Sequence, residues 1–235
     1  MRQNVSLVIP ILNEEELLAE RVKLLDAELK KEFQNYEIVL TENGSVDNTK
    51  SIARNLEKEF TNVKAVIDDG PGDYGQALIY GINACKYDEV GILELDYLDM
   101  QFFYQAYDML LTHDLIIGSK RLGNNIDQRG FKRKMFTELY NFLLRVNFNL
   151  KLSETHGLKV LRKSKLDHIT NGCVTRNAVW PSEFCIRAVR DKNLTVKEIP
   201  LSLPLREIRV TRIKAFKRLK KTLDDLMLLR KALAK

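Results

Sequence analysis

Three acidic side chains follow an apolar run in the first half of the chain. Residues 90–99 begin with apolar side chains and carry Glu94, Asp96 and Asp99. The apolar part is typical of a strand buried on both faces of a parallel sheet, and ligands of such sheets bind outside the carboxyl ends of strands. Proteins usually hold Mg²⁺ with one or two carboxylates together with substrate phosphates, so Glu94 and Asp96 could form such a site. On these residues alone, solvated acids at a strand end are an equally good interpretation.

Further polar side chains follow the other strands expected in this half. Pro10 and Asn13 come after the first apolar segment, and Glu42 ends the second. Asn13 is also a good N-cap for the next helix, whereas a simple connection needs no acid at Glu42. The glycine-rich residues 70–77 precede a helix, where backbone amides can approach a phosphate, although any long loop collects glycine. We expect these side chains at the same sheet edge as Glu94.

Alternating strands and helices must position these residues. Apolar segments predict strands at 5–9, 36–41, 63–67, from 90, at 114–118 and 194–199, with a short strand within 153–159. Amphipathic segments predict helices from 13 to about 33, up to about 60, up to about 86, and at 101–111, 131–150, 180–192 and 213–233. The alternation implies an α/β fold with a parallel, Rossmann-like sheet. Neither GxGxxG after the first strand nor GxxxxGK[ST] is present, which argues against dinucleotide binding and a P-loop.

Basic residues are concentrated in the second half of the chain. The 235 residues carry a formal net charge of +6, with basic clusters at 129–134 and 206–221. The clusters favour an anionic partner, namely nucleic acid, a phosphorylated substrate or an anionic membrane surface. Nucleic acid is least favoured, because no aromatic residues interleave with the basic ones in a known motif. Three cysteines without metal-ligand spacing, no leader-like start and no span-like apolar window predict a cytoplasmic protein with at most peripheral membrane contact.

Residues 213–235 form a basic amphipathic segment after a domain expected to span 1–212. Its apolar stripe consists of Ile213, Phe216, Leu219, Leu223, Leu226 and Met227. Helices of this kind lie on anionic bilayers, yet a terminal helix packed on its domain shows the same stripe. Both interpretations remain open at this stage, and the sequence indicates no oligomeric state.

The order of the motifs resembles the inverting nucleotide-sugar glycosyltransferases of family 2 with the GT-A fold. The dolichyl- or polyprenyl-phosphate mannose and glucose synthases are the most similar members. The resemblance covers about residues 5–212, and each motif is weak alone while the ordered series is fairly specific. Its matching segments are 8–15, 42–49, 72–77, 94–96, 118–121, the helix positions Arg133, Thr137 and Asn141, and 198–206.

The resemblance implies a GDP- or UDP-hexose donor and a polyprenyl phosphate acceptor. Glu94 and Asp96 would hold Mg²⁺ or Mn²⁺ against the donor diphosphate, with Arg133 as a further catalytic residue. The implied donor-binding residues are Pro10, Asn13, Glu14, Glu42, Gly72 and Gln76. The cations for the acceptor phosphate would be Lys120, Arg121, Arg129, Arg133, Arg206 and Arg209. An ionised phosphate hardly needs a general base, and a single in-line attack would invert the sugar carbon.

Departures from the family pattern leave two alternatives. Glu94 replaces the first metal-binding Asp, and Asn43 replaces the second acid of the family's acid-acid pair. Ser153 and His156 stand where the family more often shows Asp and Ser, so Glu154 could take over the role of the acid. If the acceptor were a sugar hydroxyl, Glu154 or His156 would be the first candidates for the required base, although a lone histidine is more often structural. The other alternative is a catalytically weak nucleotide-sugar-binding protein.

Overall fold

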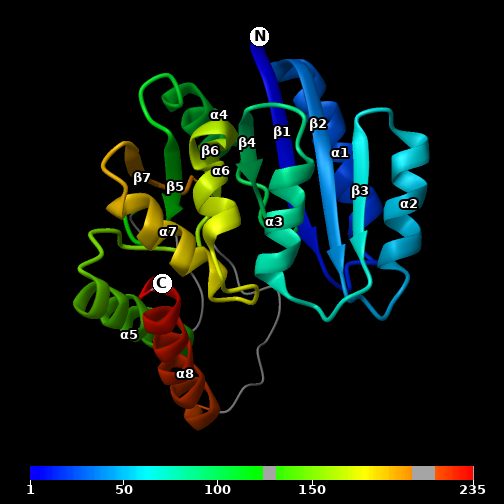
Figure 1. Ribbon diagram of the computed structural model, residues 1–235. Helices are drawn as coiled ribbons and strands as arrows, with labels where there is room; N and C mark the ends of the chain where they lie inside the picture. Colours follow the sequence, from blue (N-terminus) through cyan, green and yellow to red (C-terminus); the bar gives the residue numbers. More distant parts are fainter. Residues whose placement is uncertain (124–130, 203–214, 235) are drawn as a thin grey trace.

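The chain folds around one mixed β-sheet with helices on both faces (Figure 1). The computed structural model describes residues 1–123, 131–202 and 215–234, with only the backbone of 132–133 and 215–222. The strands are β1 (Arg2–Ile11), β2 (Phe33–Asn43), β3 (Val63–Asp68), β4 (Glu89–Ile92), β5 (Leu115–Ser119), β6 (Lys159–Arg162) and β7 (Val196–Pro200). The helices are α1 (Leu18–Glu32), α2 (Thr49–Glu59), α3 (Tyr74–Ala84), α4 (Met100–Met109), α5 (Phe131–Phe148), α6 (Lys163–Gly172), α7 (Trp180–Arg190) and α8 (Ala215–Leu233).

The sheet of the described chain has the order β3-β2-β1-β4-β6-β5-β7. All neighbouring strands are parallel except β6, which runs antiparallel to both β4 and β5. The expected mostly parallel, Rossmann-like sheet is therefore confirmed. Lys159 is in register with Ile92 of β4 and with Ile117 of β5. The antiparallel β6 thus begins at the edge where β4 and β5 end.

The strands direct alternate side chains to two apolar layers, as a period of two requires. On one face, Leu7 of β1 lies in a buried cluster with side chains of α1, α2 and α4. On the other face, Val8 of β1 lies in a cluster with side chains of α3, α6 and α7. Helices cover both sides of the sheet, so only its edges are available for a site.

Helices α5 and α8 lie together beyond the carboxyl edge of the sheet (Figure 1). Leu226 and Leu229 of α8 lie in the cluster that contains Val8, and Ala232 is also buried. Arg187 of α7 donates from Nη2 to the carbonyl of Ala232 at 2.8 Å. This end of the C-terminal segment therefore packs on the domain. Of the apolar stripe expected for the segment, Leu226 is buried and Leu223 and Met227 are exposed, while the side chains of Ile213, Phe216 and Leu219 lie outside the described residues.

Three local expectations were wrong. The short strand expected within 153–159 is β6 (Lys159–Arg162), which shares only Lys159 with that segment, because residues 153–158 form a loop. Asn13 does not cap α1, which begins only at Leu18; with φ at +55° it forms a turn instead. Helix α6 was not predicted. The apolar residues that it buries are Leu166 and Ile169, and two apolar positions are too few to show a helical period in the sequence. Among the described helices, none is long and apolar enough to cross a bilayer.

Candidate active site

The acidic pair lies directly beyond the end of β4. The backbone amide of Leu93 still bonds the carbonyl of Val8 in β1 at 3.1 Å, and a turn then brings the amide of Tyr97 to the carbonyl of Glu94 at 2.9 Å. This turn leaves Glu94 and Asp96 partly exposed at the carboxyl edge of the sheet. Both residues therefore lie at the edge where ligands of such sheets bind.

Asp99, the third acid of the run, has a structural role. Its Oδ1 accepts from the amide of Phe102 at 3.0 Å and caps α4, and its Oδ2 accepts from the amide of Ser202 at 2.6 Å. The side chain is fully buried. Asp99 therefore fixes α4 and the segment after β7, and it is not a third accessible carboxylate beside Glu94 and Asp96.

Tyr74 at the start of α3 orients the Glu94 carboxylate, because its hydroxyl donates a hydrogen bond to Glu94 Oε1. Burial and the charge of Asp96 raise the pKa of Glu94, although Tyr74 and the charges of Lys159 and Lys120 oppose the rise. Burial and the neighbouring Glu94 raise the pKa of Tyr74 well above its usual value, so the hydroxyl remains a donor. The arrangement presents Glu94 in one direction at the sheet edge.

The chemistry of this acidic pair fits a hard divalent cation. Glu94 and Asp96 offer carboxylate oxygens, and Mg²⁺ is commonly bound by one or two carboxylates plus substrate phosphates. No group of three or more His, Cys, Asp or Glu side chains placed for a metal occurs in the part of the chain that the structure describes. A cation held by the pair would therefore take its remaining ligands from substrate and water.

The residues expected at the donor gather around one turn after β2. Buried Glu42 accepts at Oε1 from the amide of Ser45 at 2.6 Å, and Lys50 Nζ lies 3.8 Å from Oε2. Asn13 bonds the same turn twice: its backbone amide donates to Ser45 Oγ at 3.0 Å, and its Oδ1 accepts from the amide of Val46 at 2.9 Å. The ends of β1 and β2 are thereby joined, with Pro10 at the end of β1.

The glycine-rich loop before α3 packs against this turn. Gly44 has φ at +85°, and a Cβ atom there would lie 2.6 Å from the amide nitrogen of Gly72, so the site requires glycine. Asn43 donates to Asp68 Oδ2 at 2.7 Å and accepts from the amide of Asp73. Asn43, which departs from the family's acid-acid pair, therefore holds the loop in place.

Helix α3 links the donor residues to the acidic pair. The backbone amide of Gln76 donates to the carbonyl of Arg176 at 2.7 Å. A Cβ atom on Gly75 would lie 2.4 Å from Cβ of Trp180. These contacts fix the first turn of α3, which carries both Gln76 and Tyr74, and Tyr74 reaches Glu94. Glu14 lies on the other side of the turn after β2, where its amide donates to Thr49 Oγ1 at 2.7 Å.

Two of the expected acceptor cations follow β5. Lys120 Nζ lies 3.3 Å from Glu154 Oε2, and Arg121 Nη1 lies 2.5 Å from Glu138 Oε2 on α5. The side chains of both cations are mostly buried. Arg129, Arg206 and Arg209, and the side chain of Arg133, lie outside the described residues.

The loop before β6 places Glu154 beside Lys120. Glu198 of β7 holds this loop, since its Oε2 accepts from the Ser153 amide at 2.8 Å and its Oε1 from the Glu154 amide at 2.9 Å. Burial alone would raise the pKa of Glu154, but the charge of Lys120 and hydrogen bonds from the His156 backbone amide and from Lys120 lower it overall. Glu154 is therefore an ionised, ion-paired carboxylate near neutral pH.

His156 has protein partners at both ring nitrogens. Nε2 donates to the carbonyl of Ala178 at 2.9 Å, and Nδ1 lies 3.1 Å from the hydroxyl of Thr155. That hydroxyl continues to Ser182 at 2.9 Å and from there to Tyr140 of α5 at 3.0 Å. Desolvation lowers the pKa of His156. This arrangement favours a neutral ring that ties α5 and α7 to the loop.

Lys159, the first residue of β6, belongs to none of the sequence motifs, yet it lies close to the candidate site. Its buried ammonium donates to the carbonyls of Thr155 at 2.9 Å and Gly157 at 2.8 Å. Burial lowers the pKa of Lys159, and the charges of Glu154 and Glu94 oppose this. The sequence signal for this buried charge was a lysine between the apolar residues of the segment 158–161.

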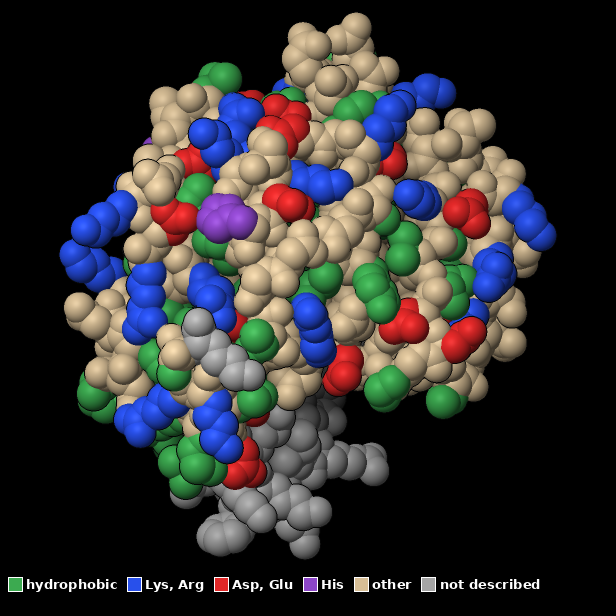
Figure 2. Space-filling model, viewed as in Figure 1, with side chains coloured by type: hydrophobic (Ala, Val, Ile, Leu, Met, Phe, Trp, Pro, Cys, Tyr) green, Lys and Arg blue, Asp and Glu red, His purple; other side chains and the backbone are tan. Residues whose placement is uncertain are grey.

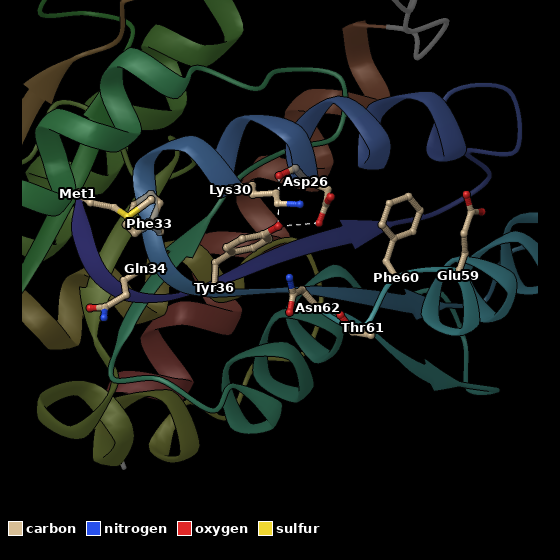
Figure 3. A pocket seen from close by; sticks show the side chains of 10 residues that line it. All are labelled: Met1, Asp26, Lys30, Phe33, Gln34, Tyr36, Glu59, Phe60, Thr61 and Asn62. Carbon is tan, nitrogen blue, oxygen red and sulfur yellow. Dashed lines mark hydrogen bonds between the residues drawn. The ribbon is translucent and has the colours of Figure 1, made fainter.

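A pocket at the opposite edge of the sheet is unrelated to these residues (Figure 3). It surrounds Tyr36 near the start of β2, where the hydroxyl of Tyr36 donates to Asp26 Oδ1 at 2.9 Å. Ligands of open α/β sheets bind at the carboxyl edge, so this pocket at the amino end of β2 is not part of the candidate site.

Sequence comparisons match most of the sheet to a known family. Residues 6–170 match the model described as "Glycosyl transferase family 2". An undecaprenyl-phosphate 4-deoxy-4-formamido-L-arabinose transferase of Pseudomonas fluorescens is 38% identical over 95 residues, which are 39% of this chain and 27% of that protein. Glycosyltransferase AglD of Haloferax volcanii is 23% identical over 203 residues, 84% of this chain and 32% of that protein. The chain thus spans about a third or less of the length of these curated relatives.

Solved structures share the fold. Glucosyl-3-phosphoglycerate synthase from Mycobacterium tuberculosis, in complex with Mn²⁺, UDP and phosphoglyceric acid, is similar with a TM-score of 0.65 and 16% identity. The match covers 96% of this chain and 78% of that one. The same enzyme with Mg²⁺ and UDP gives a TM-score of 0.66 at 16% identity, over 96% and 79% of the two chains. At this identity the likeness establishes the architecture alone.

Proposed function

The chain belongs to glycosyl transferase family 2 with a GT-A-like fold, and from this premise we propose that it transfers a hexose from a UDP- or GDP-hexose to a polyprenyl phosphate at the cytoplasmic face of a membrane. One observation carries the proposal. Glu94 and Asp96 lie directly after β4, while the cations Lys120 and Arg121 follow β5 two strands away at the same edge. A reaction between two anionic substrates needs both kinds of group, one for the donor diphosphate and one for the acceptor phosphate.

The donor would bind on the side of β1, β2 and α3. Buried Glu42 and the turn that it shares with Asn13 would form the floor of this site. Pro10, Glu14, Gly72 and Gln76 would be the further donor-binding residues. An acid held in this way can accept hydrogen bonds from a base or a ribose. Structures of glucosyl-3-phosphoglycerate synthase with Mn²⁺ or Mg²⁺ and UDP bound have the same fold, which supports a nucleotide donor for this chain.

Glu94 and Asp96 are the residues that would hold Mg²⁺ or Mn²⁺. The cation would supply charge neutralisation for the departing nucleoside diphosphate. Tyr74 keeps the Glu94 carboxylate oriented, and Lys159 and Lys120 place positive charge near it.

The acceptor phosphate would bind at Lys120 and Arg121, with Arg129, Arg133, Arg206 and Arg209 as further predicted cations. An ionised phosphate is a nucleophile without a base, so these residues would have to overcome repulsion between two anions. The relative from Pseudomonas fluorescens, named for an undecaprenyl-phosphate substrate, supports a lipid phosphate acceptor.

A second candidate is transfer to a sugar hydroxyl, with Glu154 as the general base. One observation favours it: Glu154 is a buried carboxylate whose pKa is lowered, so it is ionised and able to accept a proton. Its ion pair with Lys120 counts against this role, because the paired carboxylate is a weaker base. His156 is a less suitable base, since protein groups occupy both of its ring nitrogens.

The test is release of UDP or GDP from nucleotide-hexoses with Mg²⁺ or Mn²⁺, with and without a short polyprenyl phosphate. We expect release that needs both the metal and the lipid phosphate, and a loss of about a hundredfold or more in Asp96→Asn. Asp167→Asn, the same exchange on α6 away from the sheet edge, is the matched control and should retain full activity. Release that requires a sugar hydroxyl would instead establish the second candidate. Nucleotide binding without release under all these conditions would contradict both.

A further inference from the structure

Helix α5 exposes a continuous apolar stripe. It consists of Phe131, Met135, Leu139, Phe142 and Val146, which are 80%, 49%, 37%, 54% and 66% exposed. The spacing of four, four, three and four residues confines the side chains to an arc of about 80° over about 22 Å of helix. The opposite face of the helix buries Asn141, Leu144 and Phe148. The α5 stripe is therefore a face of the helix that the described part of the chain leaves exposed.

The α5 stripe borders the candidate acceptor site. Glu138, which lies on the edge of the stripe by helical position, forms the ion pair with Arg121 after β5. Arg230 of α8 donates to Asn147 of α5, so the two helices lie side by side beyond the carboxyl edge of the sheet (Figure 1). A ligand with its phosphate at Arg121 would have an apolar surface next to it.

Helices α5 and α8 are basic in composition. Helices α5 and α8 together contain ten Lys and Arg residues and three Asp and Glu residues. Figure 2 shows Lys and Arg side chains interspersed with hydrophobic ones over this part of the molecule. A second copy of the chain would bring an equally basic face against the stripe, whereas an anionic surface is complementary to it.

We propose that the α5 stripe is the surface with which the protein lies on an anionic lipid bilayer. The stripe enters the headgroup region, and the basic residues of α5 and α8 contact lipid phosphates. The buried residues of α8 hold that helix on the domain, and its exposed Leu223 and Met227 form a shorter apolar surface than the α5 stripe. The main apolar contact with lipid is therefore made by α5. The inference rests on the proposed function, because it explains how a phosphate anchored in a bilayer reaches Arg121.

Vesicle co-sedimentation of the full chain tests this inference. The vesicles contain phosphatidylglycerol and phosphatidylcholine, or phosphatidylcholine alone, without prenyl phosphate or nucleotide. We expect binding to the anionic vesicles and a reduction of about tenfold or more in Phe142→Glu and in Val146→Glu, because each removes apolar contact. Leu24→Glu is the matched control: Leu24 is an exposed leucine on α1, 56% exposed against 54% for Phe142, and it gains the same charge. It should bind within about twofold of the unaltered chain.

Three outcomes would overturn the inference. One is unchanged vesicle binding by both stripe variants, another is an equal loss in Leu24→Glu, and the third is a dimer in solution that Phe142→Glu dissociates without any change in vesicle binding. Turnover with a short, water-soluble prenyl phosphate is measured on the same proteins. Turnover without stripe-dependent binding would reject this inference alone, and stripe-dependent binding without turnover would reject the proposed function alone.

Discussion

At the residue scale, the hydrogen bond between Tyr74 and Glu94 explains how a glutamate can stand at the first position of the acidic pair. Most members that the chain resembles have Asp at the first position of the acidic pair, and Glu adds one methylene to the arm. In this fold the longer arm meets the hydroxyl of Tyr74 from α3. Mutation of a residue that orients a metal ligand commonly weakens metal binding by about ten- to a hundredfold. Tyr74 is therefore expected to compensate for the length of Glu94.

Replacement of Tyr74 by Phe removes this hydroxyl and keeps the ring. We expect Tyr74→Phe to bind Mn²⁺ about tenfold or more weakly in the presence of UDP or GDP, because the Glu94 carboxylate loses its orienting donor. Titration of free Mn²⁺ by electron paramagnetic resonance measures the affinity without turnover. Tyr80→Phe on the same helix is the control, since Tyr80 is exposed on α3. Equal affinity in Tyr74→Phe and the unaltered chain would show that Tyr74 has no such role.

The acids of the candidate site were predictable from sequence, but their partners were not. Glu42, Glu94 and Asp96 stand directly after apolar runs, so strand periodicity places them at one edge. Tyr74 acquires its role from Glu94, which lies 20 positions away along the chain and beyond another strand. Lys159 bonds the carbonyls of the adjoining loop, and no local pattern shows that this loop buries its ammonium group. A role that depends on a partner across the fold needs the fold to be seen.

At the element scale, Glu183 of α7 holds the segment that supports α3. Its carboxylate accepts from the amides of Val174 at 3.1 Å and Thr175 at 2.8 Å and from Nε of Arg187 at 2.9 Å. The next residue, Arg176, offers the carbonyl that binds the Gln76 amide. A buried acid in α7 thus fixes the first turn of the helix that carries Tyr74.

Glu183→Gln should lower the free energy of unfolding by about 2 to 3 kcal/mol at pH 7, since charged hydrogen bonds are lost in a buried place. Burial alone would raise the pKa of Glu183, but Thr175, Val174 and Arg187 lower it overall. A lowered pKa in the folded state means that the stabilisation is present above the usual pKa of glutamate and is lost as the pH falls through the folded value. The difference between the variant and the unaltered chain should therefore shrink in urea unfolding at pH 4 and below. Glu20→Gln, at an exposed position of α1, is the control, and a pH-independent difference for Glu183→Gln would contradict the account.

The strand and helix pattern was predicted best where local periodicity and packing agree. Strands β1 to β3 and helices α2 and α4 follow the expected segments within a few residues, whereas α1 ends where expected but begins later. The antiparallel direction of β6 was not predicted, because residues 159–162 are too short to carry a directional signal. Because β6 is antiparallel, the loop that carries Glu154 lies at the same sheet edge as Lys120. The strand direction that was not predicted therefore determines part of the candidate site.

At the scale of the whole molecule, the candidate site combines segments from most of the chain. The ends of β1, β2, β4 and β5 and the start of β6 all lie at one edge of the sheet, and α5 and α8 lie beyond that edge (Figure 1). Donor residues, the acidic pair and the acceptor cations follow one another across the strand order. The resemblance in the sequence predicted this general plan, while the outward apolar face of α5 became visible only with the packing of α5 and α8.

The central claim is that Glu94 and Asp96 form a metal site for a nucleotide at this edge. The most direct measurement is an anomalous difference map from crystals grown with Mn²⁺ and UDP or GDP. The account predicts a Mn²⁺ peak within about 2.5 Å of a carboxylate oxygen of Asp96, with the diphosphate as a further ligand and the base beside Glu42. A Mn²⁺ peak or a nucleotide elsewhere, for example in the pocket around Tyr36, with the acidic pair binding neither, would contradict the claim.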